Sequence, residues 1–390
     1  MPVELVLGVV AILIALAALA VALGQRAALG RARREAEAST KAESETHRPQ
    51  LAVIINPSKD GTDDVKATVR RMCSEAALPE PMFLETTVED PGTGQARQAL
   101  ESGVDVVVAA GGDGTVRAVA EALVGTGRSM GLIPVGTGNL LARNLDIPLT
   151  STEEALAIIL GGVDRPIDVG WARINDYAES DRADDAYDEA NPPLDPPSER
   201  GGPPVDSAGD PEVEGVPHIF LVIAGLGFDA AMVADTDDQL KSKVGWAAYF
   251  VSGFRHLHGR RMRAQIQLDD KPVVDARLRS VMVGNCGRLP GGITLLPDAV
   301  IDDGELDVAA VDTRGGLAGW AQLLGEVVFQ GFGMRNDLPG KIGRIDHARA
   351  KRVLVRVAGG EQAQVDGDAL GRARELEMWV EPRALVIRAP

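Results

Sequence analysis

The sequence predicts an α/β domain built on a parallel sheet, followed by a second and mainly antiparallel β domain. The chain has 390 residues, of which 45% are hydrophobic, and this length suits two domains with separate cores. Aromatic residues are only 4% of the total, so the cores should be aliphatic, as in parallel sheets covered by helices. Strand and helix patterns alternate in the first half, whereas turns separate successive strands in the second.

An uncharged apolar run stands at the N-terminus. Leu5 to Gly24 would rise about 30 Å as a helix, enough to cross a bilayer. Glu4 precedes the run and several arginines follow it, which places the following chain in the cytoplasm. We therefore expect residues 1–25 to form a single-pass transmembrane anchor in the cell membrane and residues 26–50 to form a tether. Cleavage of the run and a buried soluble helix are the two alternatives.

The first globular domain is expected over residues 51–166. Strands are predicted at 51–55, 82–87, 104–110 and 131–135, and helices at 65–77, 94–102, 115–124, 139–144 and 152–160. Strands that alternate with helices at this spacing form a parallel sheet with right-handed crossovers.

The second domain is expected over residues 167–375. Strands are predicted at 167–172, 218–224, 263–268, 278–285, 306–311, 352–357 and 384–388, and one helix at 238–254. Strands separated by turns indicate a mainly antiparallel β domain.

Much of the net charge of −17 comes from one segment. Ile174–Pro217 holds thirteen acidic residues against Arg182 and Arg200, and it is rich in Pro and Gly. We expect it to be a disordered acidic insert, solvated rather than bound to a partner. Such a charge balance also argues against a nucleic-acid-binding protein, which would carry a basic face. Cys73 and Cys286 are isolated, so the sequence offers no cysteine-based zinc site.

Two glycine-rich loops follow predicted buried strands. Gly111-Gly112-Asp113-Gly114-Thr115 leads into one helix, and Gly136-Thr137-Gly138-Asn139 leads into the next. Glycines let a backbone approach phosphate oxygens, a helix N-terminus attracts anions, and Asp113 could hold a magnesium ion. The structural alternative is an ordinary helix cap at Asp113 or Thr115. Because both loops leave parallel strands at the same sheet edge, we predict a nucleotide site there. Neither the common phosphate-loop motif nor the dinucleotide fingerprint is present.

These loops, with Asn56-Pro57 before them, resemble the diacylglycerol kinase catalytic-domain family, which includes bacterial lipid kinases, sphingosine kinases and ceramide kinases. Further elements fall in the family's order: Gly225–Ala230, Lys243 with Gly245 and Tyr249, Pro297-Asp298, Asp302-Asp303-Gly304 and Val365–Asp368. The first loop alone is shared with NAD kinases and, in variant form, phosphofructokinases. The resemblance implies an α/β domain of that type, a β-sandwich with lipid-recognition elements, and a last strand, 376–390, that returns to the first domain.

The resemblance also implies roles for individual residues. The nucleotide would be bound by Asn56, Thr86, Thr87, Gly111, Gly112, Asp113, Gly114, Thr115, Gly136, Thr137, Gly138 and Asn139. Asp303 would bind a structural magnesium with carbonyls near Val300 and Glu305, although an Asp-Gly hairpin turn is the alternative. Asp368 would accept the proton of the lipid hydroxyl, as phosphoryl transfer requires, with Asp113 at the phosphates. A hairpin turn is again the alternative for Asp368.

Two positions depart from the family pattern. Relatives often have Asp after the Asn of the second loop, where this chain has Leu140. They also often have Asn-Glu where this chain has Arg117-Ala118. The phosphate loops remain, but the acceptor lipid cannot be named from the pattern.

A basic and aromatic stretch surrounds the predicted helix at 238–254. Trp246, Tyr249, Phe250 and Phe254 share one helical face, with basic residues at the ends. The aromatic face could pack inward, while Lys243 and Tyr249 are the candidates for lipid contact.

Together these features predict an ATP- and Mg²⁺-dependent kinase that phosphorylates a hydroxyl of a membrane lipid such as diacylglycerol or a sphingoid lipid. The expected partners are ATP, the lipid and the bilayer, without nucleic acid, and a homodimer is left open. The alternatives are an NAD kinase, which needs no membrane, and a non-catalytic lipid-binding regulatory protein with the same fold.

Overall fold

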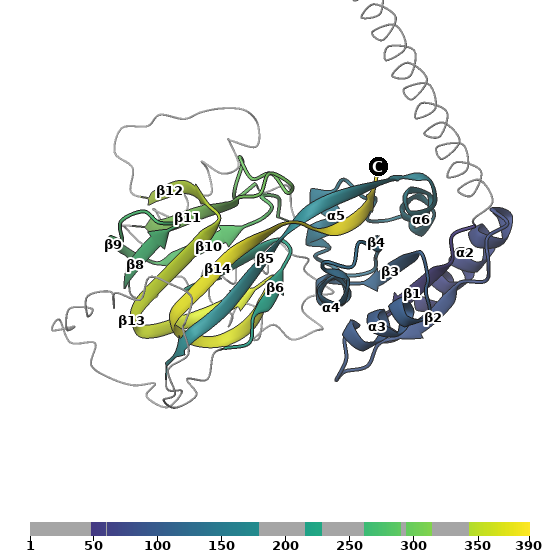
Figure 1. Ribbon diagram of the computed structural model, residues 1–390, viewed down its shortest axis with the longest axis horizontal. Coiled ribbons are helices and arrows are strands. Elements are labelled where there is room, and N and C mark those ends of the chain that lie inside the picture. Colours follow the sequence, from purple (N-terminus) through teal and green to yellow (C-terminus); the bar gives the residue numbers. More distant parts are fainter. Residues whose placement is uncertain (1–47, 60, 179–214, 228–260, 290–293, 314–342) are drawn as a thin grey trace, which may run out of the picture. The chain divides into compact units, whose positions relative to one another are not determined.

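The computed structural model describes residues 48–59, 61–178, 215–227, 261–289, 294–313 and 343–390 (Figure 1). The chain divides into two units, residues 1–49 and 50–390, and the elements below belong to the second. The predicted anchor, residues 179–214 of the predicted acidic insert and the predicted helix at 238–254, with Lys243 and Tyr249, lie outside the described residues. Among the described residues, no helix is long and apolar enough to cross a membrane.

The first half of this unit contains a parallel sheet in the order β4-β3-β1-β2. Its strands are β1 Leu51–Ile55, β2 Met82–Glu85, β3 Val106–Gly111 and β4 Ser129–Pro134. Both β1 and β3 are buried along their whole length, which explains why their sequences are continuous aliphatic runs rather than alternating ones. The predicted strands of this half are therefore confirmed.

Helices cover both faces of the parallel sheet. They are α2 Thr62–Glu75, α3 Thr93–Glu101, α4 Asp113–Leu123, α5 Leu140–Asn144 and α6 Thr152–Gly161. Val65, Val69 and Cys73 of α2 pack with Leu51, Val53 and Ile55 of β1 on one face. On the other face, residues of α3, α4 and α5 share a core with the alternate β1 residues Ala52 and Ile54. Since α2 follows β1 and α4 follows β3, the helices diverge at the boundary of these two neighbouring strands, which is where α/β sheets bind ligands.

The second half is β-rich and mainly antiparallel. Its strands are β5 Val163–Tyr177, β6 His218–Phe220, β7 Ile223–Leu226, β8 Met262–Leu268, β9 Val274–Leu278, β10 Ser280–Gly284, β11 Leu306–Thr313, β12 Gly343–Ala350, β13 Arg352–Val365 and β14 Asp368–Ala389. They enclose a second aliphatic core that includes Val281, Val353 and Leu376. The β-rich character that the sequence predicts is thus present.

Two long strands, β5 and β14, connect both halves. β14 pairs with β13 and β5, and at Val386 and Ile387 it pairs in parallel with β4 (Figure 1). The described strands thereby form one fourteen-stranded hydrogen-bonded network. The predicted segments 167–172, 352–357 and 384–388 were much too short, because each is only the most apolar part of a long strand that alternates in burial.

Several predicted boundaries were wrong. The predicted strand at 218–224 is split into β6 and β7, because the backbone amides between them turn toward a carboxylate described below. The start of the predicted acidic insert, 174–177, belongs to β5, where Ile174 is buried and pairs with Leu376. β9 and β12 were missed, since both carry several charged residues.

Asp168 on β5 fixes the junction of the two halves. Its side chain is fully buried, and its carboxylate accepts hydrogen bonds from the backbone N–H groups of Gly304 at 2.6 Å and Arg383 at 2.7 Å. Both amides sit where chains bend, at a turn after Asp303 and at an irregularity of β14. A buried carboxylate that accepts two backbone N–H groups stabilises such bends strongly.

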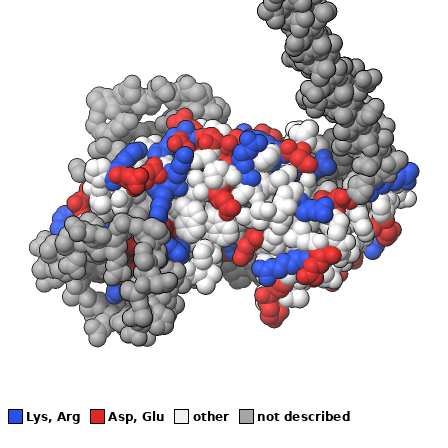
Figure 2. All heavy atoms as spheres, in the orientation of Figure 1, with Lys and Arg blue, Asp and Glu red and all other residues white. Residues whose placement is uncertain are grey.

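Charged side chains are interspersed over the face seen in Figure 2, where acidic and basic residues of the described part lie next to one another. Typical pairs are Arg71 with Glu75 and Arg165 with Asp302. The expectation that the protein does not bind nucleic acid stays a prediction.

Candidate functional site

The two glycine loops predicted from the sequence lie back to back at the carboxyl edge of the sheet. Val135 N–H donates a hydrogen bond of 3.1 Å to the carbonyl of Gly111, which holds the end of β4 beside the end of β3. A Cβ placed on Gly136 would come within 2.5 Å of the Gly112 Cα, so only glycine permits this approach. The loops therefore form one continuous surface rather than two separate turns.

Asp113, the first residue of α4, ties the two loops together. Its carboxylate oxygens accept hydrogen bonds from the backbone N–H groups of Asn139 at 3.0 Å and Leu140 at 2.6 Å. Burial raises the pKa of Asp113 above its usual value, and the N–H groups of Leu140 and Asn139 partly offset the rise. Asp113 thus caps the neighbouring helix α5, a role that differs from the cap of its own helix considered from sequence.

The second loop is shaped by its own side chains. Asn139 has a positive φ of 48°, and its side-chain amide exchanges two hydrogen bonds with the backbone of Gly136, at 3.1 and 2.7 Å. Arg143 Nε donates to the Gly138 carbonyl at 2.7 Å. Asn139 is therefore a buried residue that shapes the loop. Thr137 is the exposed residue of this loop.

The first loop presents backbone N–H groups at the start of α4. Thr115 is buried against Gly111, whereas Gly114 is exposed and a Cβ on it would meet no atom within 4 Å. The first N–H groups of a helix such as α4 have no partner within the helix and attract anions. Open space at Gly114 is compatible with phosphate groups bound at this helix start.

The other predicted nucleotide residues directly follow strands β1 and β2. The backbone N–H of Asn56 donates to the Ala110 carbonyl at 3.3 Å, which places Asn56 beside the first loop. Its side-chain oxygen accepts hydrogen bonds from Ser58. Thr86 is buried, while Thr87 is exposed and its hydroxyl accepts a hydrogen bond from the Asp90 N–H within its own turn. The nucleotide-binding roles of these residues stay predictions.

Asp368 is brought to the glycine loops from the far end of the chain. It begins β14 after the turn Asp366-Gly367, where φ values of 46° and 95° match the two-residue turns typical of hairpins. Its side chain is about half exposed, at 55%, and forms an ion pair with Arg117 of α4. Arg117 also donates to the Val365 carbonyl at 2.9 Å. The hairpin tip therefore contacts the helix that begins at the first glycine loop.

Asp366, the residue that splits β6 from β7, was not singled out from sequence. Its carboxylate points inward from the turn and accepts hydrogen bonds from the N–H groups of Leu221, Val222 and Ile223 at 2.7 to 2.9 Å. Burial raises the pKa of Asp366 to about 6, although these N–H groups and Arg117 oppose the rise. The Asp-Gly turn signal was visible in the sequence, but its inward carboxylate was not.

At the predicted structural magnesium site, Asp303 contacts an arginine side chain. Arg349 forms an ion pair with Asp303 and lies 3.4 Å from a Glu305 oxygen and 3.7 Å from an Asp307 oxygen. Val300 is exposed, and within the described ranges no group of three or more acidic, His or Cys side chains is arranged to hold a metal. A guanidinium thus occupies the position between the acids, and both Asp113 oxygens are likewise taken by backbone N–H groups. The magnesium roles of Asp303, Glu305, Val300 and Asp113 gain no support from these contacts.

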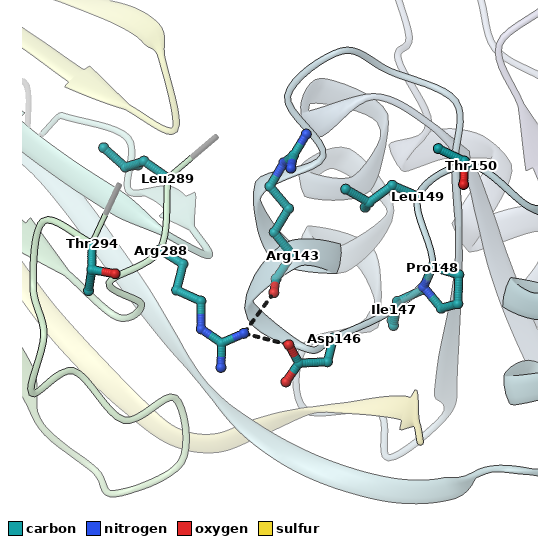
Figure 3. Close-up of a pocket in the computed structure, with 9 residues that line it drawn as sticks. All are labelled: Arg143, Asp146, Ile147, Pro148, Leu149, Thr150, Arg288, Leu289 and Thr294. Carbon is teal, nitrogen blue, oxygen red and sulfur yellow. Dashed lines mark hydrogen bonds and ion pairs between the residues drawn. The ribbon is translucent and has the colours of Figure 1, made fainter. Parts of the chain in front are cut away.

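A pocket of about 540 Å³ opens beside α5 (Figure 3). Its wall includes Ile147, Pro148 and Leu149 on one side and Arg288 on the other. Arg288 bonds to Asp146 at 2.5 Å and to the Arg143 carbonyl at 3.3 Å, while the Arg143 side chain extends away from them toward the second glycine loop. These contacts fix the α/β half against the segment that follows β10.

Comparisons with known proteins cover both halves. Residues 50–172 match a family model described as the diacylglycerol kinase catalytic domain, and residues 222–389 match the YegS C-terminal NAD kinase beta sandwich-like domain. The chain is 29% identical to the "Probable lipid kinase YegS-like" of Pseudomonas aeruginosa PAO1 over 354 residues, which is 87% of this chain and 94% of that protein. A protein of the same name from Pseudomonas putida KT2440 is 30% identical over 297 residues, 75% of this chain and 80% of that protein.

One further relative and one solved structure bear a different name. The "Diacylglycerol kinase" of Bacillus subtilis strain 168 is 26% identical over 321 residues, 81% of this chain and 88% of that protein. The fold is similar to the crystal structure of a diacylglycerol kinase from Bacillus anthracis strain Sterne, with a TM-score of 0.62 and 22% identity over 88% of this chain and 98% of that one.

Gly136→Ala tests the contact between the loops. The added Cβ would meet backbone of Gly112, which cannot yield without moving the end of β3, so we expect the free energy of unfolding to fall by about 1–3 kcal/mol. Gly114→Ala is the matched control, because its Cβ meets no atom and α4 tolerates alanine. Urea unfolding measures both variants. Equal stability of the two would show that the loops are not packed as described.

Asp366→Asn tests the buried carboxylate. Its pKa is raised from about 4 in the unfolded chain to about 6, so the stability that Asp366 contributes is present below pH 4 and is lost as the pH rises through 6. This loss is on the order of 1–3 kcal/mol of the free energy of unfolding. Asparagine cannot ionise, so the free energy of unfolding of the variant should fall less than that of the wild type between pH 4.5 and pH 7, by about this amount. Urea unfolding at the two pH values compares the variant with the wild type. An unchanged difference would contradict the assignment.

Proposed function

Because this chain belongs to the diacylglycerol kinase catalytic-domain family, we propose that it is an ATP-dependent lipid kinase. The substrate class is a membrane lipid with a free hydroxyl, such as diacylglycerol or a sphingoid lipid. One observation carries the proposal: the hairpin tip with Asp368 contacts α4, the helix whose start forms the first glycine loop. A phosphate-binding helix start and a carboxylate that can accept a proton thereby share one side of the molecule.

The phosphates of ATP would lie at the start of α4, against the exposed Gly114 and beside the Thr137 hydroxyl. The helix N-terminus and glycine backbone supply N–H groups that a side chain at these positions would obstruct. Mg²⁺ would bind with the triphosphate and neutralise its charge. Each Asp113 oxygen accepts a backbone N–H group of the second loop. Asp113 would then act by holding the two glycine loops together.

Asp368 would orient the lipid hydroxyl and take its proton. As the hydroxyl oxygen bonds to the γ-phosphorus, the bond from that phosphorus to the β–γ bridging oxygen breaks, so the products are the phosphorylated lipid and ADP. Positioning supplies most of the rate in such transfers, and a well-placed base adds to it. The exposure of Asp368 is compatible with access by a hydroxyl from outside.

We further propose that Leu5–Gly24 anchors the chain in the cell membrane, with the kinase on the cytoplasmic side where ATP is available. Lys243 and Tyr249 remain the candidates for lipid contact. Anchoring would keep the site close to a substrate that does not leave the bilayer.

Asp368→Asn tests the catalytic assignment. With ATP, Mg²⁺ and vesicles containing diacylglycerol or a sphingoid lipid, we expect wild-type chain to transfer labelled phosphate to one of these lipids. The variant should be about 10²–10⁴ times slower, because the amide cannot accept the proton. ATP affinity, measured by titration calorimetry, should stay nearly unchanged because the phosphates are held by α4.

The control for this test is Asp270→Asn, which changes an exposed acid in the turn after β8 and should keep full turnover. Full turnover in Asp368→Asn would exclude it as the base. Transfer to NAD instead of any lipid would favour the NAD kinase alternative, and ATP binding without transfer would favour a non-catalytic protein.

Removal of residues 1–25 tests the anchor. The full chain should sediment with membranes and resist extraction by high salt, whereas the shortened chain should stay in the supernatant and still phosphorylate detergent-dispersed lipid. Sedimentation of the shortened chain under the same conditions would contradict the proposal, as would protease cleavage of the kinase from outside sealed cells.

A further inference from the structure

Arg117 lies between the first glycine loop and the hairpin tip. It stands one helical turn after Asp113, so the two side chains leave the same side of α4. One guanidinium nitrogen donates to the Val365 carbonyl at 2.9 Å, and another pairs with the Asp368 carboxylate. Arg117 therefore contacts both ends of the turn, at Val365, the last residue of β13, and at Asp368, the first residue of β14.

We propose that Arg117 is a positioning residue, which holds the Asp368 carboxylate at a fixed place relative to the glycine loops. The inference rests on the proposed function, because the role of Asp368 as proton acceptor belongs to it. Asp113 fixes the loops to one another on one turn of α4, and Arg117 fixes the proton acceptor to the same helix on the next. A single helix would then set the distance between the phosphate site and the base.

The contact pattern suits arginine better than lysine. A guanidinium presents several N–H donors in a rigid plane and can satisfy a carbonyl and a carboxylate together, whereas a lysine is a single point charge. The Arg117 side chain is 21% exposed, so most of it is ordered against its neighbours. Its charge also reaches nearby groups, because it opposes the burial that raises the pKa of Asp366 and, second to burial, lowers the pKa of His218 on β6.

A plain contribution to stability accounts poorly for this arrangement. Ion pairs with a partner as exposed as Asp368, at 55%, add little to the free energy of folding. The turn is already closed by its own positive-φ residues and by Asp366, which three backbone amides hold. What Arg117 adds is an attachment of this turn to α4, which limits the motion of the turn and sets the direction of the Asp368 side chain.

A double-mutant cycle separates positioning from other roles. Arg117→Ala should lower kcat for lipid phosphorylation about 10- to 100-fold, because small misplacements of a reacting group have effects of this size. In the Asp368→Asn background, the same change should alter kcat by less than about twofold, since the group that Arg117 positions is no longer there. Arg117→Lys should recover part of the loss. ATP affinity should change little in any of these variants.

Arg71→Ala is the matched control, because Arg71 lies on α2 and pairs with Glu75 and Glu153 at the surface. Arg71→Ala should leave kcat unchanged in each background, that is, equal to wild type when Asp368 is present and equal to Asp368→Asn when it is replaced. An equal loss from Arg117→Ala with and without the Asp368 carboxylate, or a marked loss of ATP affinity, would mean that Arg117 acts on the nucleotide and would overturn the inference. A rise in kcat would mean that the ion pair restrains Asp368, which also overturns it.

Hydrogen exchange of the turn provides a readout that does not need activity. We expect the amides of residues 366–370 to exchange faster in Arg117→Ala than in wild-type chain or Arg71→Ala, while the amides of β1 and β3 keep their protection. Unchanged exchange at the turn would show that Arg117 does not hold it. If wild-type chain phosphorylates no lipid but exchange at the turn still depends on Arg117, the proposed function fails and the contact stands.

Discussion

The contact of Asp113 with the backbone amides of Asn139 and Leu140 is the constraint on which the rest of the site depends. It joins the turn after β3 to the turn after β4, and it allows Gly112 and Gly136 to approach closer than any side chain would permit. The carboxylate is removed from water by the same packing, which raises its pKa. A charged residue is therefore used to shape the phosphate-binding surface, at a position that the motif alone suggests for a metal ligand.

The long strand β14 brings Asp368, from the C-terminal part of the chain, to this surface. It begins at the hairpin tip, runs along β5 and β13, and ends beside β4 of the parallel sheet. Asp168 stabilises the place where β14 bends, through the buried bond to the Arg383 amide. Because the same strand carries Asp368 at one end and pairs with the sheet at the other, the relative position of the two halves is built into continuous backbone.

Local patterns predicted the fold well where burial is continuous and poorly where it alternates. The aliphatic runs of β1 and β3 and the glycine loops after β3 and β4 could be placed from sequence, since each pattern is local. The lengths of β5, β13 and β14 could not, because buried residues alternate along these strands with polar or partly exposed ones. The contacts of Asp113, Asp366 and Arg117 join segments distant in the chain, and the sequence indicates only that these residues are present. Asp303 is a further example, since its acidic neighbours are visible in the sequence but its ion pair with Arg349 is not.

The most direct measurement is a crystal structure of the chain with a non-hydrolysable ATP analogue and Mg²⁺. We expect the phosphates at the start of α4, in contact with the backbone of Gly112 and Gly114, and the Asp368 carboxylate facing the γ-phosphate across a space that admits one hydroxyl group. Asp113 should keep its bonds to Asn139 and Leu140 in that complex. Phosphates bound away from α4, or an Asp368 carboxylate turned away from them, would contradict the link between loops, hairpin and phosphoryl transfer.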